Sequence, residues 1–269
     1  MIKRIKEIYA YRSMIKSLVK RDLKGRYKGS ALGFLWTFIN PLFQLLVYTF
    51  VFSIVMRNGI KDFYMFLFVA LIPWLFFSTC LAGGSTCIIA QKNMVQKIYF
   101  PREVLPLSYV ISQFVNMLLS FIIIFAVMLV SNIIPGGILG AKYAFNVPAL
   151  LCLVPVMIIE FLLALGFTFL LSALTVYFQD TQYITGIATM AWQFLCPIMY
   201  SMELIPENWL KIYMLNPMTP IIIAYRDILY FGRVPEMSTL LLALAMGVLL
   251  FGIGWFAFNR MQRHFAEEM

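Results

Sequence analysis

Six long apolar runs constrain the fold of this sequence more than any other feature. Their residue ranges are 31–56, 63–90, 105–134, 146–178, 182–202 and 237–260. Glu160 and Arg260 are the only charged residues inside them. A helix needs about 20 apolar residues to cross the hydrocarbon core of a bilayer, so each run is long enough to cross once. The sequence therefore predicts an all-α membrane protein with six transmembrane helices.

The composition excludes a soluble enzyme. Hydrophobic residues make up 62% of the 269 residues and charged residues 12%. In soluble domains the apolar fraction averages roughly 45–50% and the charged fraction about 25%. So few polar side chains cannot cover a surface that faces water. The six runs also leave no stretch long enough for a separate soluble domain, so residues 1–269 are expected to form a single transmembrane domain.

Basic residues are distributed unevenly between the two sides of the predicted helices. Of the 21 Lys and Arg residues, 15 lie in the N-terminal segment, the loops after the second and fourth runs, and the C-terminal tail. The other six lie in the three connections on the opposite side. Since cytoplasmic loops are enriched in Lys and Arg, both termini are predicted to be cytoplasmic.

Residues 1–28 are predicted to form an amphipathic helix in the cytoplasmic membrane interface. Isoleucine, leucine and valine recur there at three- and four-residue steps, and lysine and arginine lie between them. Such a helix is too charged to span the bilayer, but its apolar face can contact acyl chains while its cations contact lipid phosphates. A simple anchor is the alternative interpretation.

The loop at 91–104 is predicted to contain a short helix, a bend and the start of a new helix. Pro101 disfavours helix at Phe100 but is well tolerated in the first turn of a helix. A short helix at 91–99 with Tyr99 and Phe100 beside it would offer a docking surface to a cytoplasmic partner. An ordinary solvated loop is the alternative.

Two short helices are predicted between the fifth and sixth runs, in the segment 203–236. Its apolar pieces are too short to cross a membrane, and four prolines divide it. Re-entrant helices that dip into the outer leaflet and return fit this pattern, and a plain extracellular cap is the alternative.

Two motifs carry a resemblance to a known family. The strings KRDLKGRYKGSALGFLW at 20–36 and IYFPREVLP at 98–106 resemble the permease subunit of type-2 ABC exporters for cell-surface polysaccharides. That family carries lipid-linked O-antigen, teichoic acid, capsule or rhamnan across the bacterial cytoplasmic membrane. The resemblance covers essentially the whole chain, including the interfacial helix, the six spans and the segment at 203–236, which it assigns to an external gate.

The resemblance implies a homodimer of permeases bound by two ATP-binding cassette subunits. The expected cargo is a lipid-linked polysaccharide, with membrane lipids around the protein and no nucleic acid. The sequence contains no G-x-x-x-x-G-K-[ST] motif for ATP phosphates. ATP and Mg²⁺ are therefore expected on the partner subunit, with no enzyme activity and no cofactor in this chain.

A gradient-driven secondary transporter or flippase of a lipid-linked or amphiphilic substrate is the main alternative. Such carriers use ionisable residues inside the membrane. Glu160 is the only acid well inside a predicted span, and no span interior contains Lys, Arg or His to pair with it. This isolation favours the ABC exporter.

The cysteines and the single histidine do not indicate a metal site or a catalytic site. The four cysteines, at 80, 87, 152 and 196, all lie in apolar runs without a CxxC pair. The single histidine, His264, lies five residues from the C-terminus. No metal site and no catalytic residue are predicted.

The two inner loops between spans are expected to contact the ATPase. The predicted coupling residues are Lys97, Ile98, Tyr99, Phe100, Pro101, Arg102 and Glu103 in the first loop, and Phe178, Gln179 and Asp180 in the second. A second set of cations lies where the interfacial helix meets the first span and is predicted to hold the phosphate of a lipid carrier, with positive-inside anchoring as the alternative. This set is Arg21, Lys24, Arg26 and Lys28.

The first and fifth spans are predicted to line the glycan path. Both carry amides and a proline inside apolar helices, Asn40-Pro41 in the first and Gln193 with Pro197 in the fifth, and such groups are tolerated beside a hydrated cavity. Aromatic faces can bind the C–H faces of sugars without a fixed hydrogen-bond pattern. The predicted lining residues are Trp36, Phe38, Trp192 and Tyr200. Helix packing and structural kinks are the alternative.

Overall fold

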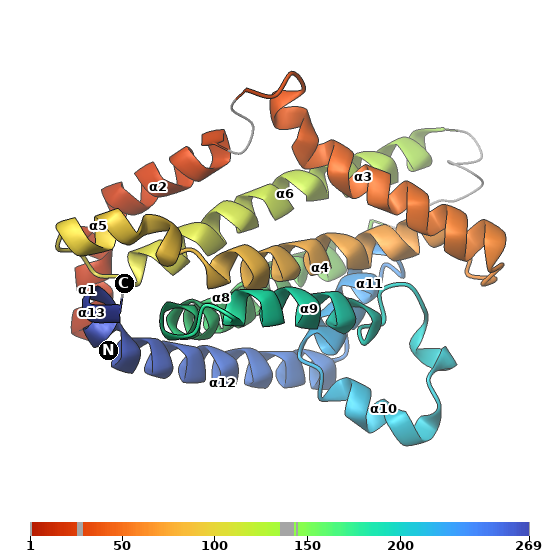
Figure 1. The fold of residues 1–269 in the computed structure, drawn as a ribbon. Helices are drawn as coiled ribbons and strands as arrows, with labels where there is room; N and C mark the ends of the chain where they lie inside the picture. The colour runs from red at the N-terminus through yellow and green to blue at the C-terminus, as the bar shows by residue number, and fades with distance from the viewer. Residues whose placement is uncertain (1, 26–28, 135–142, 144, 269) are drawn as a thin grey trace.

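The computed structural model describes residues 2–25, 29–134, 143 and 145–268, and helices form most of this part (Figure 1). The N-terminal helices are α1 (Ile2–Ala10), α2 (Arg12–Gly25), η1 (Gly33–Leu35), α3 (Trp36–Thr49), η2 (Phe50–Val55), α4 (Phe63–Ser85), η3 (Ile89–Gln91) and α5 (Lys92–Lys97). The remaining helices are α6 (Val104–Ile133), α7 (Val147–Leu151), α8 (Leu153–Tyr177), α9 (Thr181–Phe194), η4 (Met202–Leu204), α10 (Glu207–Met214), α11 (Met218–Leu229), α12 (Met237–Met261), η5 (Gln262–His264) and α13 (Phe265–Glu268).

Five helices among the described residues are long and apolar enough to cross a membrane. They cover Gly33–Val55, Phe63–Ser85, Val104–Ile133, Val147–Tyr177 and Met237–His264. Each coincides with one of the predicted runs. The prediction of an all-α membrane protein is confirmed.

The fifth predicted run, 182–202, is helical over only part of its length. Helix α9 ends at Phe194 after 14 residues, and at 1.5 Å per residue it is about 21 Å long, shorter than the hydrocarbon core. The chain turns after Leu195 because Pro197 disfavours helix at Cys196. The crossing at 182–202, and with it the count of six spans, stays a prediction.

Helix α4 forms the centre of the bundle. In its most apolar stretch 78% of the residues are buried, and it packs against α3, α6, α8, α9 and α11. Its core side chains include Trp74 and Phe77, which are almost fully buried. The most extensive helix pair is α8 with α12, where Gly166 and Gly254 let the two backbones approach closely.

Helix α3 is the least covered of the long helices. Only 6% of the residues in its most apolar stretch are buried, and it lies along α4 and α6 at the edge of the bundle (Figure 1). Pro41 lies inside it, and its last turns widen into the π-helix η2. Large apolar side chains such as Phe43 and Leu46 are therefore exposed, which suits contact with lipid or with another protein chain.

The N-terminal segment forms two helices in place of the single one predicted. Tyr11 separates α1 from α2, and α2 packs along α6. Both ends of the chain, α5 and the α8–α9 loop lie at one end of the bundle, while α10 and α11 lie at the other (Figure 1).

The segment at 203–236 contains two short helices, as predicted. Helix α11 has 12 residues, is about 18 Å long and is buried against α4, α8 and α12. Helix α10 has eight residues, none of them buried. How deep these helices lie in a membrane stays a prediction.

Candidate partner-docking pocket

The loop between α4 and α6 has the local structure that its proline predicts. Helix α5 ends at Lys97, and Ile98 is extended. The amide of Val104 bonds the Pro101 carbonyl over 3.1 Å, and this turn leads into α6, which begins at Val104, three residues after the proline. The short helix, the bend and the new helix are therefore all present.

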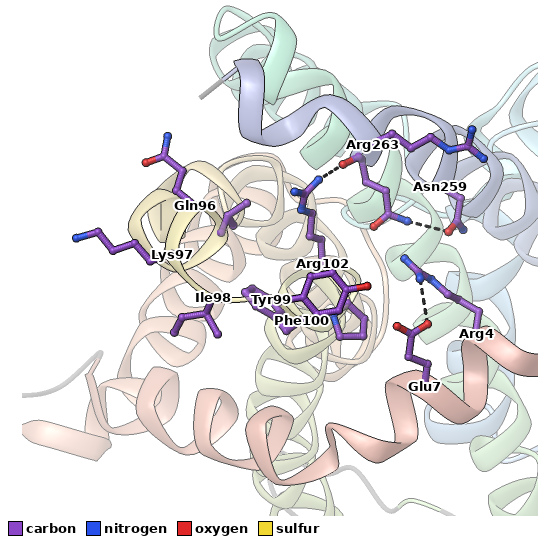
Figure 2. A pocket seen from close by; sticks show the side chains of 13 residues that line it. Arg4, Glu7, Gln96, Lys97, Ile98, Tyr99, Phe100, Arg102, Asn259 and Arg263 are labelled. Atoms are coloured by element: carbon purple, nitrogen blue, oxygen red, sulfur yellow. Dashed lines mark hydrogen bonds and ion pairs between the residues drawn. The ribbon is translucent and has the colours of Figure 1, made fainter.

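This loop forms one wall of a pocket of about 800 Å³ at the end of the bundle that holds both termini (Figure 2). Residues 95–102 line one side, with α5 supplying Gln96 and Lys97. Arg4 and Glu7 of α1 and the C-terminal residues Asn259, Gln262 and Arg263 line the other. Segments from the beginning, the first half and the end of the chain thus meet around one cavity.

Glu103 joins these segments from beneath the pocket. Its side chain is fully buried and accepts hydrogen bonds from Arg4 Nε over 2.7 Å and from Gln262 Nε2 over 2.9 Å. Arg102 donates to the Gln262 carbonyl, and its guanidinium lies 5.8 Å from the ring centre of Phe265. The loop, α1 and the C-terminal helices are consequently held as one unit.

The pocket carries an excess of positive charge. Arg4, Lys97, Arg102 and Arg263 line it, against the single acid Glu7. Burial disfavours the charged form of Arg4, but hydrogen bonds and attraction from Glu103 and Glu7 outweigh it and raise the pKa of Arg4. The cavity can therefore receive acidic side chains of another protein.

The two aromatic residues of the loop have opposite environments. Tyr99 is 89% exposed, whereas Phe100 is 6% exposed and belongs to the core. Lys97 and Ile98 are exposed, and Pro101 and Glu103 are buried. Tyr99 is thus the exposed ring of the loop, while Phe100 lines the pocket from the core, and contact of both rings with a partner stays a prediction.

The second predicted coupling loop lies at the same end of the bundle but does not line the pocket (Figure 1). Phe178, Gln179 and Asp180 are all exposed. The preceding Tyr177 donates a hydrogen bond to the Met261 carbonyl over 2.8 Å. This bond ties the loop to the C-terminal segment that forms the pocket wall.

The four predicted glycan-path residues lie in two separate places. Trp36 is exposed on α3 and donates to Ser30 Oγ over 3.0 Å, and Phe38 packs edge-on against Phe34. On α9, Trp192 packs against Phe77 and Phe167, with ring centres 5.3 and 5.5 Å away.

Trp192 and Tyr200 anchor the C-terminal end of α9. Trp192 Nε1 donates to Asn216 over 2.9 Å, and the Tyr200 hydroxyl donates to the Phe194 carbonyl over 2.9 Å. Helices α3 and α9 do meet through an unpredicted pair, in which Gln193 Nε2 donates to the Tyr48 hydroxyl over 3.2 Å. The amide in the fifth run thus faces the first span.

The predicted phosphate-binding cations are only partly described. Arg21 and Lys24 are exposed on α2, and Arg26 and Lys28 lie outside the described residues. A hydrogen bond from Ser112 to Asp22 fixes α2 on α6. Beside it runs an apolar groove of about 590 Å³, flanked by Arg12, Lys16, Lys20 and Lys24.

Sequence reasoning missed five residues of the pocket, namely Arg4, Glu7, Asn259, Gln262 and Arg263. Their separation from the loop, 99 residues for the Arg4–Glu103 pair, leaves no local pattern that could indicate the contact. The one available signal was the shared side of the membrane, since the N-terminal segment, the loop and the C-terminal tail are all basic.

Comparison with known proteins identifies the family. The family model for ABC-2 type transporters matches residues 13–230. The O-antigen export system permease protein RfbA of Myxococcus xanthus is 36% identical over 272 residues, which cover 100% of both chains. A Klebsiella pneumoniae protein of the same name is 28% identical, covering 93% of this chain and 92% of its own. The polysialic acid transport protein KpsM of Escherichia coli is 23% identical, covering 82% and 83%. This chain therefore belongs to the ABC-2 type transporter family.

Proposed function

We propose that this chain is the membrane subunit of an ATP-driven exporter that moves a lipid-linked polysaccharide out of the cytoplasm. The names of the relatives, O-antigen export permease and polysialic acid transport protein, support this cargo class. The observation that carries the proposal is the cationic pocket around residues 95–102. It offers a partner a surface built jointly from the N-terminal, loop and C-terminal segments.

Two ATP-binding cassette subunits, which carry ATP and Mg²⁺ themselves, are the proposed partners at this pocket. Membership of the ABC-2 family supports an ATP-binding partner. The excess of Lys and Arg on this side of the chain supports a cytoplasmic position for both termini and for the pocket. The membrane proposed for this chain is the bacterial cytoplasmic membrane.

The transport path is proposed to form between two copies of the chain. The support is the thin cover of α3, whose large apolar side chains are exposed over most of its length. An exposed apolar face of this size is typical of a surface that another chain or lipid covers. Trp36 and Phe38 on this helix are the proposed contacts to the glycan.

The lipid end of the cargo is proposed to enter beside α2. The apolar groove along Ile15, Val19 and Leu23 suits an acyl or prenyl chain, and the cations beside it suit a phosphate. Arg21 and Lys24 extend this positive surface toward the first span.

A single-residue test separates partner docking from folding. The change Tyr99→Ala removes an exposed ring, and a buried aromatic anchor at an interface is typically worth about 2 kcal/mol or more. We expect at least a tenfold loss of affinity for the ATP-binding subunit in a pull-down titration, with unchanged expression of the permease. Tyr9→Ala is the matched control, since Tyr9 is also exposed and lies on α1 outside the pocket. Equal binding by the two variants would contradict the assignment of this pocket to the ATPase.

A further inference from the structure

A second cavity lies inside the membrane region, between α3, α4 and α6. It has a volume of about 120 Å³. Its polar lining consists of Thr37 and Asn40 of α3, Thr79 of α4 and the α6 residues Gln113, Asn116 and Ser120. No charged residue lines it. We refer to this cavity as the amide crevice.

Three buried amide atoms in its lining have no hydrogen-bond partner among the described residues. Gln113 is 3% exposed, and its Nε2 donates to no acceptor. Both the Oδ1 and the Nδ2 of Asn116 are buried and unbonded as well. The hydroxyls of Thr79 and Ser120 differ, because each bonds a carbonyl of its own helix, Leu75 and Asn116 respectively. The amides are thus the groups available to a ligand.

The depth of the amides makes their lack of partners informative. Gln113 and Asn116 follow the start of α6 by nine and twelve residues, which places them about 14 and 18 Å along the helix. At this depth there is no bulk water, and polar groups are tolerated only where protein, a hydrated cavity or a bound molecule satisfies them. Buried amides are otherwise almost always hydrogen-bonded.

The lining selects the chemistry of the occupant. Amides donate and accept hydrogen bonds but bind no net charge, and the uncharged wall gives no counter-ion for a phosphate or a carboxylate. Trp36, which is 44% exposed, adds an aromatic face beside them. A ring that carries hydroxyl groups and has apolar C–H faces matches this lining. Its hydroxyls can bond the amides, and a C–H face can stack on the Trp36 indole.

We infer that the amide crevice is a binding seat for a sugar ring of the exported glycan, held by Gln113 and Asn116. This inference rests on the proposed function and adds a site to it. It places a hydrogen-bonding contact behind α3, on the side that faces α4 and α6.

The first test compares export by matched variants of the complete exporter. Gln113→Met with Asn116→Leu removes both amides at nearly constant volume. Each lost hydrogen bond is expected to weaken glycan binding about fivefold, so the loss of two should raise the glycan concentration for half-maximal export about 25-fold. Thermal stability should not fall, because Gln113 Nε2 and both polar atoms of the Asn116 amide have no hydrogen-bond partner among the described residues. Ser108→Ala is the control, since this serine lies on the same helix outside the crevice and its hydroxyl bonds the Leu105 carbonyl, and the variant should export as the unaltered protein does.

A second measurement reports binding directly, and it decides the matter if the double variant fails to assemble. Asn116→Cys in the complete exporter, in lipid nanodiscs, is labelled with a small neutral maleimide, and the protein without this change gives the background from the native cysteines. The probes are dodecyl glucoside, which carries one neutral sugar, and dodecyl phosphoglycerol, which carries lipid-type hydroxyls. Protection by the glucoside alone supports the inference. Equal protection by both probes, or by neither, overturns it.

Failure of this inference is distinguishable from failure of the proposed function. If the unaltered protein exports glycan with ATP and the double variant exports it equally well, only the sugar seat is wrong. If the unaltered protein exports no glycan, the proposed function itself is wrong.

Discussion

The Tyr225 hydroxyl of α11 donates a hydrogen bond to Glu160 Oε2 of α8 over 2.6 Å, and both side chains are completely buried. Glu160 is the one acid well inside a predicted span, and thus the residue on which a gradient-driven carrier would depend. It does have a neighbour, but that neighbour is a neutral phenol from the segment at 203–236. The pair therefore joins the short buried helix to the central bundle.

We expect Glu160→Gln to preserve export, because the glutamine carbonyl can accept the same bond from Tyr225. Tyr225→Phe should lower stability by about 1–3 kcal/mol, since it leaves a buried acid with no donor. Thermal unfolding of the purified complex measures the second effect. Loss of export by Glu160→Gln with intact assembly would instead indicate a proton-carrying role.

The change Glu103→Gln should loosen α1 from the pocket. It weakens the bond to Arg4, and we expect a loss of about 1–2 kcal/mol, at the low end for a buried pair because the Arg4 side chain is 36% exposed. Faster proteolytic cleavage between α1 and α2 is the measurement. Glu7→Gln removes only a partly exposed pair on the same helix and should leave the cleavage rate unchanged.

Gly254→Ala should separate α8 from α12. An added Cβ would lie 2.0 Å from the Gly166 carbonyl oxygen, so the helices must move apart, at a cost of about 1–3 kcal/mol. Gly252→Ala is the matched control in the same helix, because an added Cβ there meets nothing within 4 Å. The measurement is the midpoint of thermal aggregation, which should be lower for Gly254→Ala than for Gly252→Ala. Equal midpoints would contradict the close approach of the two helices.

The predicted glycan-path residues should divide into two groups. Trp192→Ala removes a ring packed against Phe77 and Phe167 and should cost up to about 3–5 kcal/mol, seen as poor assembly. Trp36→Ala removes an exposed ring and should reduce export while assembly and basal ATP hydrolysis stay near normal. Poor assembly of the Trp36 variant would assign that ring to packing.

The helices could be predicted from sequence because apolar runs and prolines act locally. Pro101 marks the start of α6 within three residues, and the spacing of the runs gives the five long helices. The short extent of α9 was missed, although Pro197 carried a signal for it. The depth and partners of α11 depend on packing against three other helices, which no local pattern reports.

The candidate site could be predicted only in part. The sequence located the loop at 97–103 but could not decide which side chains face outward, because the burial of Phe100 depends on its packing into the assembled core. The partners of Glu103 lie 99 and 159 residues away along the chain. Pairings of this kind appear only once the helices are assembled.

Export of lipid-linked glycan by membrane vesicles containing this chain and its ATP-binding partner tests the central claim most directly. We expect export with ATP supplied and the proton gradient collapsed by an uncoupler, and no export when ATP is withheld and the gradient is kept. Loss of export on collapse of the gradient alone, or export that continues without ATP, would contradict an ATP-driven exporter.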